Sequence, residues 1–165
     1  NSGKTDQKED NLIKKHKFHL RQLEPADYAG WLPLWREYLV FYKTELSEKT
    51  TRTTWSRLTN AEEPMFALGA FSDSGELLGI VHCIYHRSCW TEGDYCYLQD
   101  LFTAETARGR GIGTALIEAV YARAKADGAS RVHWLTHESN TAAQKLYDKL
   151  ALRSGFVQYR KVLSL

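Results

Sequence analysis

RGRGIGT, residues 108–114, stands between a segment that alternates like a strand and one with the periodicity of a helix. Its three glycines allow a tight turn and a close approach of the backbone to a ligand, because no Cβ is in the way. The following helix presents unpaired N–H groups and the positive end of its dipole, which favour an anion such as pyrophosphate. We therefore predict a phosphate-bearing ligand, bound by Arg108, Gly109, Arg110, Gly111, Gly113 and Thr114, with the arginines adding charged donors.

Two common phosphate-binding loops do not fit this stretch. A P-loop needs Gly-Lys-Ser or Gly-Lys-Thr at its end, and neither lies in the loop. A dinucleotide fingerprint needs G-x-G-x-x-G, but Thr114 or Leu116 stands where its third glycine would be. A glycine-rich turn without a ligand remains the structural alternative.

The segments on either side of the loop predict an α/β fold. Antiparallel strands followed by a strand–helix–strand unit indicate a mixed sheet with helices on both faces. The predicted strands are about Phe18–Leu20, Met65–Phe71, Leu77–Tyr85, Tyr95–Thr103, Val132–Thr136 and Phe156–Leu163. The predicted helices start near Pro25 (interrupted by Pro33), after Ser47 as N-cap, near Gly111 (to Asp127), and after Asn140 as N-cap (to about Leu150).

Six apolar residues of the first helix recur at helical spacing, which predicts one apolar face: Trp31, Leu34, Trp35, Tyr38, Phe41 and Tyr42. Such an aromatic face is typical of a core. The alternative is the wall of a substrate pocket, because Tyr38 and Tyr42 also carry hydroxyl groups.

The overall composition is that of one globular domain. The chain has 165 residues, 43% of them hydrophobic and 25% charged, with a net charge of +2. Residues 1–17 are polar and charged and predict a disordered leader, so we expect a single domain over 18–165. Three cysteines without metal-ligand spacing indicate reduced thiols and no metal site, and no apolar run is long enough to span a membrane. We therefore predict a cytoplasmic protein.

A second pattern makes a family recognisable. RGRGIG, residues 108–113, matches the [Q/R]-x-x-G-x-[G/A] signature, and NTAAQKLYDK, residues 140–149, matches N-x-x-A-x-x-x-Y-x-K. In this order the two resemble the GNAT N-acetyltransferases, most closely the branch of spermidine/spermine acetyltransferases and fungal histone, polyamine and D-amino-acid acetyltransferases. The resemblance covers about residues 18–163. It implies the GNAT fold, a mixed and mostly antiparallel sheet splayed in the middle, with acetyl-CoA as co-substrate and a homodimer joined at an exposed strand 156–163.

The resemblance also implies site residues. Leu101, Phe102 and Thr103 would line the splay that holds the pantetheine arm, with the Leu101 N–H as oxyanion donor. Asn140 would hydrogen-bond the same arm. The phenol of Tyr147 would act as general acid and protonate the departing thiolate.

The general base is less well defined. Polyamine acetyltransferases are expected to have a Glu followed by Asp on this strand, whereas this chain has Gln99-Asp100. Strand alternation turns Asp100 away from the face of Gln99 unless a bulge re-aims it, and Asp100 is nevertheless our candidate base. The other candidates are Glu138, His82, His86, and a water chain through Tyr85 or Tyr97.

The acceptor remains open at this point. The resemblance predicts an acetyl-CoA-dependent N-acetyltransferase acting on a small amine, an amino acid or a lysine. A GNAT-fold module that binds acyl-CoA without catalysis is the alternative, favoured by Gln99 and opposed by Tyr147. No basic stripe with interleaved aromatics is apparent outside the first residues, so we expect neither a nucleic-acid nor a membrane partner.

Overall fold

The computed structural model describes residues 17–164, so the expected leader at 1–17 lies, apart from Lys17, outside the described residues. The chain divides into two compact units, one up to Leu135 and one from Thr136 on, and each is described by itself. The expectation of a single domain over 18–165 therefore stays a prediction.

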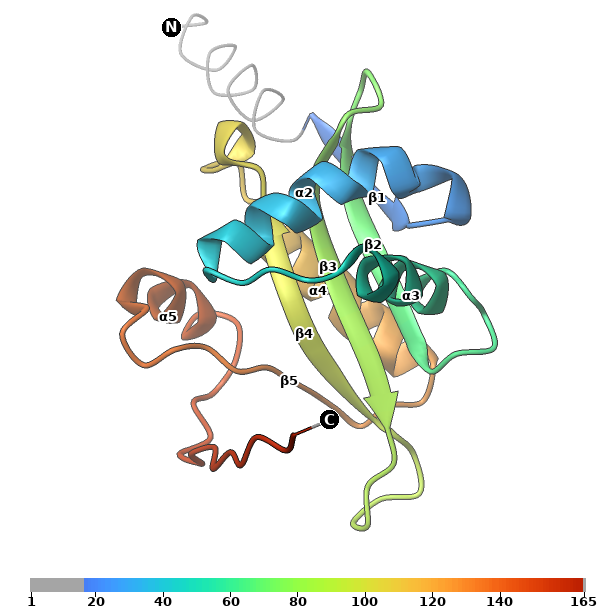
Figure 1. Cartoon of the computed structure of the whole chain (residues 1–165). Helices are drawn as coiled ribbons and strands as arrows, with labels where there is room; N and C mark the ends of the chain where they lie inside the picture. Colours follow the sequence, from blue (N-terminus) through green and yellow to red (C-terminus); the bar gives the residue numbers. More distant parts are fainter. Residues whose placement is uncertain (1–16, 165) are drawn as a thin grey trace, which may run out of the picture. The chain divides into compact units, whose positions relative to one another are not determined.

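The first unit is built on a five-stranded sheet in the order β1-β2-β3-β4-β5 (Figure 1). Four antiparallel neighbours come first: β1 (Phe18–Gln22), β2 (Met65–Ser72), β3 (Leu77–His86) and β4 (Tyr95–Thr103). The short β5 (Arg131–His133) then pairs with β4 in parallel. The predicted mixed and mostly antiparallel sheet is confirmed, although β5 ends three residues earlier than the pattern indicated.

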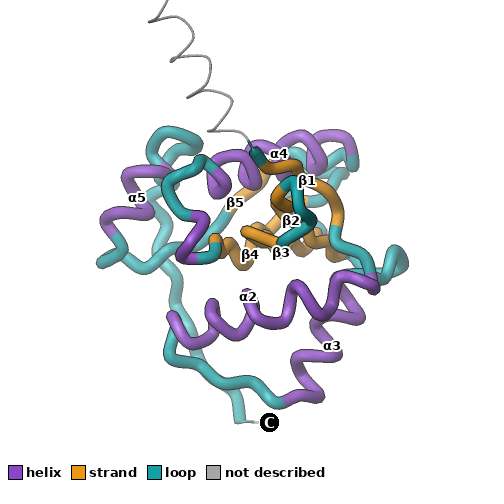
Figure 2. The backbone as a smooth tube through the Cα atoms, turned by 90° about the horizontal axis from the view of Figure 1, so that it is seen from above, coloured by secondary structure: helices purple, strands orange, loops and turns teal. Residues whose placement is uncertain are grey.

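Helices cover both faces of the sheet, as Figure 2 shows from above. A 3-10 turn (Pro25–Asp27), α2 (Tyr28–Phe41) and α3 (Glu48–Leu58) lie on one face, and α4 (Ile112–Ala126) on the other. The core under α2 and α3 contains Trp31, Trp35, Trp55, Ile80 and Phe102. On the opposite face, Ile112 and Leu116 of α4 lie against Gly79 of β3.

A local signal explains where α3 begins. The hydroxyl oxygen of Ser47 accepts a hydrogen bond from the Thr50 N–H at 3.1 Å, as expected of the N-cap of α3. Pro33 was expected to interrupt the first helix, but α2 continues through it. The ring removes one early hydrogen bond of the helix. The burial of Trp31, Leu34 and Trp35 on the face toward the sheet offsets that loss.

The second unit contains α5 (Thr141–Tyr147), which follows Asn140 as predicted but ends about three residues before the predicted end at Leu150. The predicted strand at 156–163 is wrong, because this stretch has no helix or strand in the structure. Its apolar side chains are strongly exposed, Phe156 at 89% and Tyr159 at 94%. A strand pattern supplies propensity only, and a strand also requires an edge to pair with. The expected homodimer therefore has no strand edge of 156–163 to rest on, and stays a prediction.

No helix within the described residues is both long and apolar enough to cross a membrane. All three cysteines carry free thiols, with Cys83 and Cys96 buried and Cys89 exposed. Burial raises the pKa of the Cys83 thiol well above its usual range, so this thiol stays protonated in the core.

Candidate active site

The glycine-rich loop has the backbone that its sequence predicts. Gly109 and Gly111 are both left-handed, with φ of 79° and 80°. A Cβ built on either of them would meet nothing within 4 Å, so open space lies beside this backbone. Glycine is needed here because other residues rarely adopt this conformation without strain.

The N-terminus of α4 follows directly and is suited to an anion. Gly111 is the N-cap and offers no side-chain cap, and the first turn contains no acidic residue. The Ala115 N–H makes the first bond of the helix, to the Gly111 carbonyl at 3.0 Å. The N–H groups of Ile112, Gly113 and Thr114 precede that bond, so they are the donors that a helix leaves for a ligand.

Arg108 braces the loop against the preceding strand. Its Nε donates to the Thr103 carbonyl at 3.4 Å, and its guanidinium carbon lies 5.8 Å from the centre of the Phe102 ring. Arg108 and Arg110 are exposed, so both can add positive charge at this end of the helix. The structure thus brings together, in sequence order, the predicted residues of β4 and of the loop.

The splay expected between β4 and β5 follows from their unequal lengths. The two strands pair only from Tyr95–Arg131 to Tyr97–His133, whereas β4 pairs with β3 as far as Thr103. Among the described strands, residues 98–103 of β4 therefore have a neighbour on the β3 side only. Leu101, Phe102 and Thr103 lie in this stretch, and no described strand pairs with their backbone on the β5 side.

A β-bulge lies in β4 at Gln99, immediately before the candidate base Asp100. Leu98 pairs with Cys83 and Asp100 pairs with His82, so Gln99 is the extra residue. In a regular strand Leu98 and Asp100 would share one face. The bulge instead places Asp100 on the face of His82, under α2, and leaves Gln99 exposed beside it.

Asp100 is the centre of a hydrogen-bonded group on this face. Its Oδ1 accepts from the Tyr38 hydroxyl at 2.8 Å, and its Oδ2 lies 3.0 Å from His82 Nδ1. Its side chain is 13% exposed, which leaves a small opening to solvent. Burial and the nearby Asp100 carboxylate raise the pKa of Tyr38 well above its usual range, so its phenol stays protonated as a donor.

Part of the aromatic face of α2 is core, as the first interpretation of it predicted, and part reaches the candidate site, as the second predicted. Trp31 and Trp35 are core residues, at 0% and 6% exposure, whereas Tyr38 reaches Asp100. The Trp31 indole N–H also donates to His82 Nε2, at 2.9 Å. Sequence reasoning missed the joining of Trp31, His82, Asp100 and Tyr38. The available signal was a helix face with several aromatic N–H and O–H groups.

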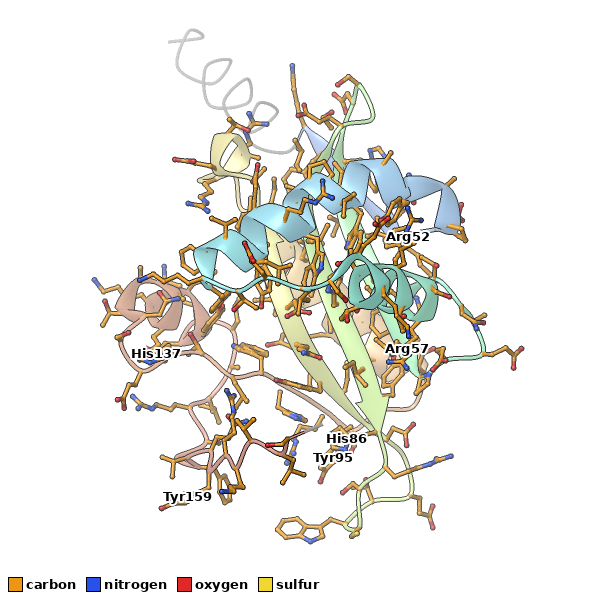
Figure 3. The ribbon with its side chains drawn as sticks, in the orientation of Figure 1. Arg52, Arg57, His86, Tyr95, His137 and Tyr159 are labelled. Atoms are coloured by element: carbon orange, nitrogen blue, oxygen red, sulfur yellow. The ribbon has the colours of Figure 1, made fainter. Side chains whose placement is uncertain are left out.

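The remaining base candidates have other contacts or positions. His86 lies at the far end of β3 beside Tyr95, with ring centres 5.7 Å apart (Figure 3). The Tyr85 hydroxyl donates to Asp127. The Tyr97 ring stacks on His133. In the second unit, Glu138 is exposed, and its carbonyl accepts from the Gln144 amide.

Asn140 and Tyr147 mark the two ends of α5 in the second unit. The Asn140 side chain accepts from the Ala143 N–H at 3.3 Å and so caps the helix. Tyr147 is the last residue of α5 and is partly buried. Its carbonyl accepts hydrogen bonds from the N–H groups of Leu150 and Ala151, so its backbone is held on the C-terminal side as well.

A family model and a known relative each match most of this chain. The model of the acetyltransferase (GNAT) family matches residues 29–151. A D-amino-acid N-acetyltransferase of Saccharomyces cerevisiae is 34% identical over 143 residues, which cover 86% of this chain and 89% of the relative.

Two solved structures share the fold. One is a ribosomal-protein-alanine N-acetyltransferase from Brucella melitensis, with a TM-score of 0.74 at 20% identity over 88% of this chain and 99% of that one. The other is an aminoglycoside N-acetyltransferase in complex with CoA, with a TM-score of 0.69 at 18% identity over 90% and 93%.

Proposed function

Because the chain belongs to the GNAT acetyltransferase family, we propose that it transfers the acetyl group of acetyl-CoA to a primary amine. The observation that carries this proposal is the uncapped N-terminus of α4 behind two left-handed glycines. Open space beside Gly109 and Gly111 and the absence of acids in the first turn fit a pyrophosphate. Arg108, Arg110, Gly113 and Thr114 complete the proposed pyrophosphate site, and Leu101, Phe102 and Thr103 are the residues proposed to bind the pantetheine arm. The family signature at residues 140–149 assigns Asn140 to the pantetheine arm as well.

The proposed chemistry assigns one proton to each catalytic residue. Acetyl-CoA supplies a thioester whose C–S bond breaks as the new C–N bond forms. Asp100 takes a proton from the ammonium, which has no lone pair at neutral pH while its pKa is near 10. The Leu101 N–H donates to the acetyl oxygen, and Tyr147 donates its phenolic proton to sulfur. The nitrogen loses its second proton as the C–N bond forms, and this proton restores the Tyr147 phenol, while Asp100 releases the first proton to solvent.

The test is the release of CoA from acetyl-CoA against a panel of amines. The panel holds D- and L-amino acids, small primary amines, spermidine and a lysine peptide. D-amino acids belong in it because they are the substrates named for the yeast relative. Turnover of at least one amine supports the enzyme. Tight acetyl-CoA binding with turnover of none would instead favour a non-catalytic binding module.

Gly111→Val should weaken acetyl-CoA binding with little effect on the fold. A β-branched side chain at φ 80° strains the loop and fills the space proposed for the pyrophosphate. The loss of one charge-assisted hydrogen bond costs about 1.5–3 kcal/mol, which is roughly 10- to 150-fold in Kd. Isothermal titration calorimetry measures the change.

Gly75→Val is the matched control. Gly75 has φ 87° and equally open surroundings, but it lies in the β2–β3 turn. Both variants should lose about 1–3 kcal/mol of stability from strain, and only Gly111→Val should lose affinity. Equal acetyl-CoA affinity in the two variants would remove the loop from the binding site.

Gln99 should limit the use of polyamines. Gln99 is exposed and immediately precedes Asp100 in the bulge, where polyamine acetyltransferases are expected to have a carboxylate. An exposed carboxylate near a cation is worth about 1 kcal/mol, or roughly fivefold. We expect spermidine to be no better than mono-amines, and Gln99→Glu to raise kcat/KM for spermidine about fivefold more than for a mono-amine. A strong preference of the wild type for spermidine would contradict this role of Gln99.

A further inference from the structure

A chain of hydrogen bonds that leads to Asp100 begins at Trp31. An indole N–H can donate but never accept, and here it lies 2.9 Å from His82 Nε2. His82 must therefore accept at Nε2, and the proton of its neutral ring is on Nδ1. Trp31 and His82 are 0% and 2% exposed, so little solvent competes for this hydrogen bond.

With its proton on Nδ1, His82 can donate a hydrogen bond to the Asp100 carboxylate. Its Nδ1–H points at Asp100 Oδ2 at 3.0 Å, while the Tyr38 hydroxyl donates to Oδ1 at 2.8 Å. Each carboxylate oxygen of Asp100 thus accepts one hydrogen bond, Oδ2 from His82 of β3 and Oδ1 from Tyr38 of α2. Each oxygen also has a second acceptor position, which remains for the hydrogens of an amine.

The other tautomer of His82 would reverse this effect. With the proton on Nε2, the Nδ1 lone pair would face the Asp100 carboxylate, and two acceptors would repel each other. Asp100 would then be held by Tyr38 alone. A misplacement of about 1 Å at a reacting group can cost on the order of 100-fold in rate.

We propose that Trp31 and His82 are positioning residues for acetyl transfer: Trp31 selects the tautomer of His82, and His82 aims Asp100 at the acceptor amine. This inference rests on the proposed role of Asp100. It separates the two neighbouring tryptophans of α2 by function, although both are buried in the same core.

Trp31→Phe and Trp35→Phe form the decisive pair of variants. The two rings stack with centres 5.7 Å apart, but within the described residues the buried Trp35 indole N–H has no hydrogen-bond partner. Both substitutions remove an indole N–H and similar volume. Trp31→Phe should lower kcat/KM for the amine about tenfold at an unchanged acetyl-CoA Kd, and Trp35→Phe should leave kcat/KM near that of the wild type.

Two variants of His82 test the direction of the contact. The amide of His82→Asn lies near the position of Nδ1 and can still donate to Asp100. The amide of His82→Gln reaches the position of Nε2 and cannot. We expect His82→Gln to lose roughly 10- to 100-fold in kcat/KM for the amine, and His82→Asn to stay closer to the wild type.

A measurement independent of activity completes the test. ¹⁵N shifts of the imidazole should report a ring protonated on Nδ1 in the wild type and in Trp35→Phe, and a mixture of tautomers in Trp31→Phe. If Trp31→Phe and Trp35→Phe behave alike in both measurements, Trp31 only packs and the inference is wrong. Thermal unfolding shows which variants are folded. If a His82 variant is not, the tryptophan pair still decides.

Asp100→Asn separates the positioning role of Trp31 and His82 from the proposed role of Asp100 as base. An inactive Asp100→Asn variant together with a fully active Trp31→Phe variant overturns the positioning role alone. A fully active Asp100→Asn variant overturns the proposed role of Asp100 and, with it, the positioning role.

Discussion

Asp100→Asn should lower kcat/KM for the amine by about 10²–10⁴-fold while acetyl-CoA binding is kept. The amide keeps the size of the side chain but cannot take the proton of the ammonium. The NH₂ group of the amide would also face a hydrogen-bond donor, either the Tyr38 hydroxyl or His82 Nδ1–H, in place of the oxygen that now accepts from it. One buried donor left without an acceptor costs about 1–3 kcal/mol, so some stability should be lost as well. Steady-state kinetics at saturating acetyl-CoA, at a temperature where the variant is folded, measures the effect.

The pH dependence separates a lost base from a damaged fold. Asp100→Asn can use only amine that is already neutral in solution, so its kcat/KM should rise about tenfold per pH unit toward the amine pKa near 10. If Asp100 deprotonates the bound ammonium, kcat/KM of the wild type should vary much less over this range. Asp94→Asn is the control, because this carboxylate pairs with the exposed Arg87 in the β3–β4 connection. Parallel pH profiles of Asp100→Asn and the wild type would exclude Asp100 as the base.

Tyr147→Phe should lower kcat by about 10²–10⁴-fold with acetyl-CoA binding nearly unchanged. The substitution removes one phenolic oxygen at the end of α5 and almost no volume, so the fold should be kept. We expect kcat to fall because the departing thiolate of CoA would leave without a proton. Single-turnover kinetics gives the rate of the chemical step, and calorimetry gives the Kd of acetyl-CoA.

Tyr159→Phe is the matched control in the same unit, because its side chain is 94% exposed. It should have the kcat of the wild type. Wild-type kcat in Tyr147→Phe, measured where chemistry limits turnover, would assign the proton on sulfur to another donor or to water.

Local sequence determined the parts of the molecule whose hydrogen bonds are local. Ser47 and Asn140 cap the helices that they were expected to cap, since a cap bonds its own first turn. Gly109 and Gly111 are left-handed because no other residue adopts this backbone as readily. β4 has the predicted bounds, and α4 differs from its prediction by one residue at each end. The proposed phosphate site is therefore readable from one stretch of seven residues.

Tertiary structure decided the rest, where the partners are distant in the chain. Residues 156–163 have the pattern of a strand but no strand in the structure, because a strand depends on the edge that it meets. Gln99 is the extra residue of a bulge: on one side of it Asp100 pairs with His82, and on the other Leu98 pairs with Cys83. This pairing depends on β3, which is distant in the chain. That bulge turns Asp100 toward His82, 18 residues earlier, and Tyr38, 62 residues earlier. Side-chain hydrogen bonds across such separations form only when the sheet and α2 pack together, so no local pattern encodes them.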